Sequence, residues 1–150
     1  MQGKTQLERV PFLFAKHPIL LSEAVWKGGV LPRVSLKAES PAASVVLLLT
    51  AAWVPANAEI LTRVSFVYRD GSRSAPRELR NKKELRDWFL ATDSRGISPA
   101  FRFVSPRMLE YGVFLIEVTN PEPAKEVAAI ELEAVGDALI ILAGASLRTP

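Results

Sequence analysis

The chain contains no cysteine and only one histidine, His17. Without cysteine it has no disulfide, no thiol nucleophile and no thiolate metal site. A single histidine excludes a multi-histidine metal site and leaves few schemes for acid–base catalysis. The chain also lacks a glycine-rich phosphate-binding loop. We therefore expect neither a metal nor another cofactor.

Long hydrophobic runs are also missing. The longest strongly apolar stretch, residues 42–54, is shorter than the roughly 20 residues needed to span a bilayer. Met1 is followed by Gln-Gly-Lys-Thr, with no apolar segment leading to a small-residue cleavage site, so no signal peptide is expected. No membrane contact is predicted. Two localisations stay open: cytoplasmic if the chain is complete, or extracellular if it is a domain of a secreted parent.

The length of 150 residues suits a single domain spanning 1–150. The net charge of +3 is unevenly distributed, with +7 on residues 1–83 and −4 on residues 84–150. The basic residues are densest over 69–86. A cluster of this kind could bind an acidic polysaccharide or a phosphate backbone. We favour a solvated hairpin face, and few aromatic residues interleave with the charges, so no nucleic-acid partner is expected.

The pattern of apolar residues and turn signals predicts eight to ten short strands. Residues 44–55 form a continuous apolar run typical of a buried strand, and residues 61–73 alternate up to an Asp70-Gly71 hairpin turn. Further strands are expected over 99–106, 111–120, 128–136 and 137–147. Asn81 with Glu84 three residues later predicts one helical turn within 81–90. This spacing favours an antiparallel β-sandwich or barrel.

Two prolines, Pro121 and Pro123, interrupt the strand pattern over residues 114–134. Proline cannot donate a ladder hydrogen bond, so it ends a strand firmly. Alternation resumes at Ile130. We interpret the Asn-Pro-Glu-Pro segment as a corner at which the chain leaves one sheet and enters the other.

Several motifs occur in one order along residues 10–145. They are VPF (10–12), VVLLLTAAWVP (45–55), VSFVYRDGS (64–72), KELRDWF (83–89), FLIEVTNPEPAKEVAAIELEA (114–134) and a last apolar strand. This order resembles the galactose-binding-like, carbohydrate-binding jelly-roll modules appended to bacterial glycoside hydrolases. The resemblance implies a jelly-roll β-sandwich and an accessory role in polysaccharide processing. Those modules often carry an aromatic residue just before the Asn-Pro, where this chain has Glu117, Val118 and Thr119.

The candidate binding residues are aromatic and cationic. Trp26 lies in a loop rich in glycine and proline and is our choice for stacking on a sugar ring. Tyr68, Arg102 and Tyr111 are expected to assist it by stacking or hydrogen bonding. We interpret the other two tryptophans, Trp53 and Trp88, as core residues.

Three functions are compatible with these features. The first is a non-catalytic carbohydrate-binding or accessory module. The second is an assembly module that binds another protein or a second copy of itself through an exposed strand edge or sheet face. The third is a small glycan-active enzyme, which we do not expect. The carboxylates are scattered without a selected pair, and His17 has no nucleophile nearby in the sequence.

Overall fold

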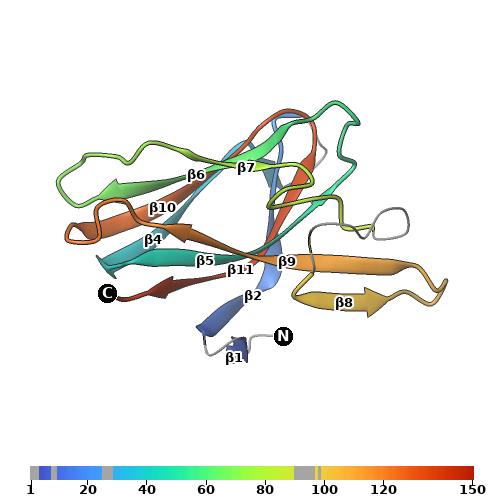
Figure 1. Cartoon of the computed structure of the whole chain (residues 1–150), viewed down its shortest axis with the longest axis horizontal. Coiled ribbons are helices and arrows are strands. Elements are labelled where there is room, and N and C mark those ends of the chain that lie inside the picture. The colour runs from blue at the N-terminus through green and yellow to red at the C-terminus, as the bar shows by residue number, and fades with distance from the viewer. Residues whose placement is uncertain (1–3, 8–9, 25–28, 90–96, 98) are drawn as a thin grey trace.

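The chain is built only of strands and loops in the computed structural model, which describes residues 4–7, 10–24, 29–89, 97 and 99–150, with side chains from residue 17 onward (Figure 1). The strands are β1 (Lys4–Leu7), β2 (Val10–Leu21), β3 (Val30–Leu31), β4 (Arg33–Pro41), β5 (Ser44–Ala52), β6 (Ile60–Tyr68), β7 (Arg77–Arg80), β8 (Phe101–Val104), β9 (Glu110–Thr119), β10 (Glu126–Ala134) and β11 (Leu139–Arg148). The predicted all-β class is confirmed. None of these residues belongs to a helix that could cross a membrane.

The strands form two open sheets. Sheet A has the order β1-β2-β11-β5-β9-β8, with β3 added to β2 in parallel, and sheet B has the order β4-β10-β6-β7. All other strand pairs are antiparallel. Most connections between successive strands cross from one sheet to the other, so the two sheets are interleaved along the sequence.

One hydrophobic core joins the two sheets. Leu47 and Phe114 enter it from sheet A, and Phe66 and Ile130 enter it from sheet B, each with at most 2% of its surface exposed. Two antiparallel sheets that share a core in this way are compatible with a β-sandwich.

β5 is the central strand of sheet A, between β11 and β9, and all of its residues are buried. Because successive side chains point to opposite faces, Leu47 and Leu49 enter the shared core. Val46 and Leu48 pack on the other face. A strand that is buried on both faces has no polar alternation, which explains the continuous apolar run and confirms its interpretation.

The Asp70-Gly71 turn joins β6 to the returning chain, as predicted. The N–H of Gly71 donates to the carbonyl of Tyr68 (3.0 Å), and the N–H of Tyr68 donates to the carbonyl of Ser72 (2.9 Å). Gly71 has φ +84°, a left-handed conformation that glycine adopts without strain. The side chain of Asp70 accepts the N–H of Ser72 (2.8 Å) and so fixes the turn.

The proline-rich segment after β9 is the crossing between sheets that the sequence predicted. β9 lies in sheet A and β10 lies in sheet B. Asn120, at the start of the crossing, is 2% exposed, and its amide donates to the carbonyl of Ala42 (2.8 Å). Its backbone N–H donates to the carbonyl of Ala43 (2.8 Å). The corner is therefore tied to the connection between β4 and β5.

The predicted helical turn within 81–90 is wrong for the residues described there. Lys82 has φ +61°, which is incompatible with a right-handed helix. The carboxylate of Glu84 accepts the backbone N–H of Arg80 (2.9 Å) instead of that of Asn81, so no capping box forms. The segment is a wide turn after β7.

Candidate functional site

Tyr68 and Asn120 connect the two sequence motifs that carry the family resemblance. The hydroxyl of Tyr68 donates to Oδ1 of Asn120 (2.7 Å), and both residues are almost fully buried. The same oxygen accepts the N–H of Glu122 (3.0 Å). Burial, followed by the charge of Glu122, raises the pKa of Tyr68. The ring and hydroxyl of Tyr68 are thus part of the fold, and the structure places this predicted site residue in the core.

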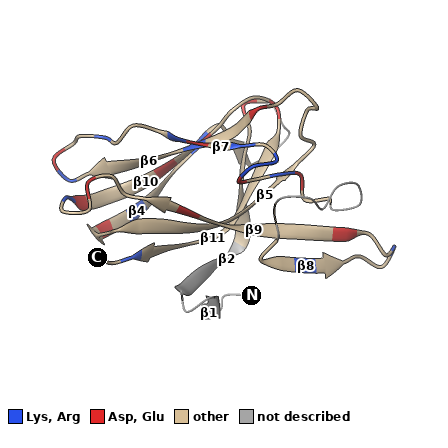
Figure 2. Ribbon diagram, in the orientation of Figure 1, with Lys and Arg blue, Asp and Glu red and all other residues tan. Residues whose placement is uncertain are grey.

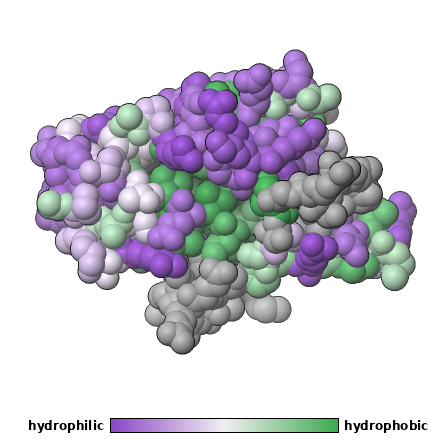
Figure 3. Space-filling model, in the orientation of Figure 1, coloured by the Kyte–Doolittle hydropathy of each residue, from purple (hydrophilic) through white to green (hydrophobic). Residues whose placement is uncertain are grey.

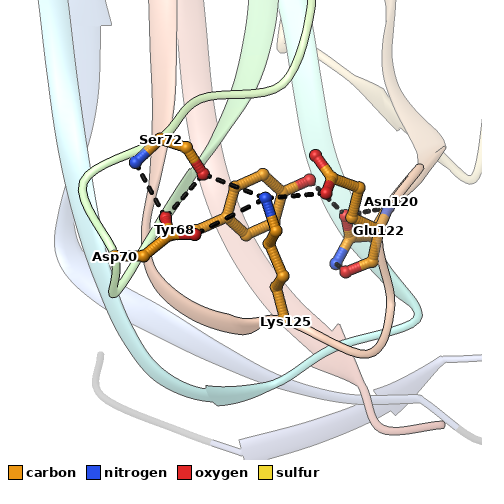
Figure 4. Close-up of polar contacts among 6 residues, drawn as sticks. All are labelled: Tyr68, Asp70, Ser72, Asn120, Glu122 and Lys125. Carbon is orange, nitrogen blue, oxygen red and sulfur yellow. Dashed lines mark hydrogen bonds and ion pairs between the residues drawn. The ribbon is translucent and has the colours of Figure 1, made fainter.

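Lys125 covers the outer side of the same junction (Figure 4). Its ammonium lies 2.7 Å from Glu122, 3.5 Å from Asp70 and 5.0 Å from the ring centroid of Tyr68. It also donates to the hydroxyl of Ser72 (3.2 Å). The turn after β6 and the crossing after β9 are therefore held together by one polar network.

The arginines of the basic stretch 69–86 are largely paired with glutamates. The pairs across and beside sheet B are Arg69–Glu126, Arg73–Glu131, Arg77–Glu84 and Arg80–Glu78. Figure 2 shows acidic and basic residues interspersed over β6, β7 and β10. Such exposed pairs add little stability, but they balance the charge. The favoured interpretation, a solvated hairpin face, agrees with this geometry.

The segment 86–89 fills the space where β5 and β9 separate. Their pairing ends at Leu49 and Phe114. Beyond that point the N–H of Trp88 donates to the carbonyl of Ala51 (2.6 Å), and the carbonyl of Trp88 accepts the N–H of Gly112 (2.8 Å). Trp88 is thereby fixed between two strands of sheet A.

An aromatic cluster lies beside this segment. The ring of Tyr111 is 5.0 Å from Trp88, 5.9 Å from Phe89 and 5.3 Å from Phe103, measured between centroids, and it stacks on Phe103 at 18°. Trp88 is half-buried rather than fully buried, so its predicted place in the core is only partly correct. The cluster joins β8, β9 and the inserted segment into one aromatic surface.

Apolar side chains remain exposed along β8 and the turn that follows it. They are Phe101, Phe103, Val104, Met108 and Leu109, and Met108 reaches 81% exposure. Figure 3 shows apolar surface at β8 and again over the region where β5, β9 and β11 lie. β8 pairs only with β9, so its other edge carries unpaired backbone groups in the part of the chain that the structure describes.

Trp53 follows β5 and is 61% exposed, so its predicted role as a core residue is wrong. Its φ of +52° is rare for a bulky residue and strains the backbone. The next residue, Val54, donates its N–H to Oδ2 of Asp87 (3.2 Å), while Oδ1 of Asp87 accepts the N–H of Phe89 (3.0 Å). Asp87 therefore caps backbone groups of both segments.

The four predicted site residues do not form one site. Trp26 lies outside the described residues. Tyr68 is at the junction of the two motifs, while Arg102 and Tyr111 are neighbours on the β8–β9 hairpin, where Arg102 pairs with Gly112. Arg102 lies 3.5 Å from Glu110. Since alternate residues point to opposite faces, Arg102 and the Tyr111 ring face opposite ways.

The carboxylates considered for catalysis are mostly engaged with other groups. Glu117 lies 3.5 Å from Arg148, Glu133 lies 2.8 Å from Arg33, and Glu131 forms a bidentate pair with Arg73. Asp93, another of the scattered carboxylates of the sequence, lies outside the described residues. Within the described ranges, no group of three acidic or histidine side chains is arranged to hold a metal ion.

Comparisons of the chain with family models, curated proteins and solved structures gave no match. Function therefore rests on the geometry of the chain's own side chains. Sequence reasoning missed the exposure of Trp53. The only sequence signal for an exposed Trp53 is its position at the strand end, directly before Val54-Pro55, where a turn was to be expected.

Proposed function

We propose that the chain is a non-catalytic carbohydrate-binding module whose main contact is Trp53. The observation that carries this proposal is the 61% exposure of Trp53 at a strained backbone position. Exposing an indole and straining its backbone both oppose folding, so a function is the better explanation for keeping them. The face of an indole is a platform on which the axial C–H groups of a pyranose ring can pack.

The segment tied to the Trp53 turn carries further aromatic and polar residues. Asp87 ties the Trp53 turn to the segment that carries Trp88, and Trp88 contacts Tyr111. Phe103 extends the aromatic surface on β8. In this proposal Trp53 takes the stacking role that the sequence assigned to Trp26, and Tyr111 keeps a supporting role.

We also propose that the two sheets form a galactose-binding-like jelly roll. Support comes from the contact between the two most distinctive motifs. The Tyr-Arg-Asp-Gly-Ser turn and the Asn-Pro-Glu-Pro crossing share the hydrogen bond between Tyr68 and Asn120 and the contacts of Lys125. Residues that build one network are expected to occur together as a set, which is how they occur in the modules that the sequence resembles.

A glycan array probed with fluorescently labelled chain is the direct test. Shallow sites bind single sugars weakly, so a multivalent display is needed to detect them. We expect binding to one class of neutral polysaccharide fragments, and loss of that binding in Trp53→Ala. Trp88→Ala is unsuitable as a control because its ring is packed against Tyr111. Met108→Ala removes an apolar side chain that is more exposed still, 81% against 61%, from the β8–β9 turn and is the matched control.

A second function is favoured by a separate observation, the exposed apolar edge of β8. Phe101 and Phe103 alternate with Arg102 on a strand whose outer edge has no partner strand among the described residues. Such an edge can accept a strand from another protein or from a second copy of the chain. If no glycan binds and the chain is dimeric in sedimentation experiments, this assembly role replaces the carbohydrate proposal.

A further inference from the structure

A hollow of about 300 Å³ lies on the outer face of sheet B, on the opposite sheet from Trp53. Residues of β4, of the turn between β6 and β7, and of β10 surround it: Ser35, Lys37, Glu39, Arg69, Glu126, Ala128 and Ala129. The two alanines on β10 are the smallest side chains among these residues. Their size leaves space between the longer charged side chains on either side. The volume is at the lower end of the range for small-ligand sites.

The backbone is irregular at the same place. Glu39 has φ +51°, a left-handed conformation that is unfavourable for a residue with a Cβ. The pairing of β10 shifts register between Val127 and Ala129, against both β4 and β6. Bulges of this kind redirect side chains and are common beside binding sites. The left-handed Glu39 and the register shift against β4 belong to one irregularity, because Glu39 lies between the paired residues Ser40 and Lys37.

The charged groups of the hollow balance one another. Lys37 and Arg69 are cationic, while Glu39 and Glu126 are anionic. The guanidinium of Arg69 lies 2.6 Å from Glu126, and a hydrogen bond from Arg69 to that carboxylate raises the arginine's pKa, with a smaller contribution from the charge of Glu39. A ligand with a net charge would have to compete with one of these partners.

We propose that this hollow is a second carbohydrate contact that takes a neutral pyranose through a pair of adjacent hydroxyls. A hydroxyl donates to a carboxylate and accepts from an ammonium or guanidinium, so a diol can bridge Glu126 and Lys37 without breaking the ion pair. The apolar face of the ring packs on the methyl groups of Ala128 and Ala129. The ligand class rests on the proposed carbohydrate-binding function, but the site is separate from Trp53.

The two sites would hold a polysaccharide differently. Trp53 would hold a sugar by stacking, and the hollow would hold one by hydrogen bonds. Because they belong to different sheets, each can be removed without touching the other. Two weak sites on one chain raise the avidity for a polymer or a branched surface.

The test is a ¹H–¹⁵N NMR titration of the full chain with methyl pyranosides of galactose, glucose, mannose and fucose. We expect shifts of the amides at 35–39, 69 and 126–129 that persist in Trp53→Ala. Ala129→Phe fills the hollow and should abolish these shifts. Glu126→Gln should weaken the affinity measured from these shifts about tenfold, since a hydrogen bond to a charged group is lost. Glu133→Gln, on the same strand and paired with Arg33 outside the hollow, is the matched control and should bind normally.

The outcomes separate this inference from the proposed function. Shifts confined to residues around Trp53 and Trp88 would overturn the second site and leave the carbohydrate proposal intact. Shifts confined to the hollow would support the second site and remove Trp53 from the account. Equal binding by Ala129→Phe, Glu126→Gln and the parent would overturn the hollow as a site. If Ala129→Phe fails to fold, Glu126→Gln against Glu133→Gln still decides the matter.

Discussion

Asp87 accepts the backbone N–H of Val54 at 3.2 Å and thereby fixes the turn that presents Trp53. Its second oxygen accepts the N–H of Phe89 at 3.0 Å. One carboxylate thus joins the end of β5 to the inserted segment 86–89. Val54, the residue after Trp53, is held by this charged acceptor and by packing against the core.

Removing this carboxylate should therefore loosen the turn. Asp87→Ala leaves two N–H groups without their acceptor and should lower the free energy of unfolding by about 1–2 kcal/mol, as for a lost helix cap. Asp87→Asn keeps one acceptor oxygen, so its free energy of unfolding should lie between those of the parent and Asp87→Ala. Urea unfolding followed by circular dichroism measures the difference. If Asp87→Ala matches the parent within 0.5 kcal/mol, on the order of the scatter for neutral surface changes, the cap is unimportant.

The Gly71 turn gives a second prediction. Gly71 has φ +84° and open space around the position of a Cβ, so a new side chain meets no clash and only the backbone conformation matters. Gly71→Val should cost about 1–2 kcal/mol, and Gly71→Asn should cost less because asparagine tolerates this conformation. Thermal unfolding of the two variants checks the order. Equal midpoints would show that the turn rearranges freely.

The buried bond between Tyr68 and Asn120 gives a third. Tyr68→Phe removes a hydroxyl from a site with 1% exposure, while Asn120 keeps the N–H of Glu122 as a donor. The cost should be about 1–2 kcal/mol. Asn120→Leu leaves the carbonyl of Ala42 unpaired as well and should cost more. Denaturant unfolding of both variants tests this order, and the reverse order would contradict the role given to Asn120.

Stability at acid pH is the subject of the fourth prediction. Hydrogen bonds from Ser72, followed by the charge of Lys125, lower the pKa of Asp70 below its usual value. A carboxyl whose pKa is lower in the folded chain than in the unfolded chain, where it is about 3.9, stabilises the fold at pH values above about 3.9. This stabilisation is lost as the pH falls through the pKa of the folded chain. Asp70→Asn should be less stable than the parent at pH 7, and the two should converge in strong acid. Melting curves of both proteins from pH 7 to pH 2 measure this. A difference in melting temperature that widened on acidification would contradict it.

Much of the fold could be predicted because the strands obey simple periodicity. The run at 44–55 has no polar alternation because β5 is covered on both faces. The alternation at 61–68 reflects a strand with one face in the core. The Asn-Pro-Glu-Pro segment predicted a change of sheet because proline cannot continue a ladder. These are local signals, and each agrees with the tertiary structure.

The site could not be predicted in the same way. The wide turn after β7 was mistaken for a helical turn because Asn81 and Glu84 have the spacing of a cap, whereas the positive φ of Lys82 has no sequence signature. Trp53 was assigned to the core because tryptophan is usually buried. Its exposure depends on Asp87, which is distant in sequence. A contact between distant residues leaves no periodic trace.

The affinity of Trp53→Ala for the glycan that the array selects tests the central claim most directly. Isothermal titration of that glycan into the parent, Trp53→Ala and Met108→Ala measures it, after circular dichroism has shown that all three are folded. The account predicts at least about tenfold weaker binding for Trp53→Ala, which corresponds to about 1.4 kcal/mol, and unchanged binding for Met108→Ala. Equal affinities of the parent and Trp53→Ala would contradict it.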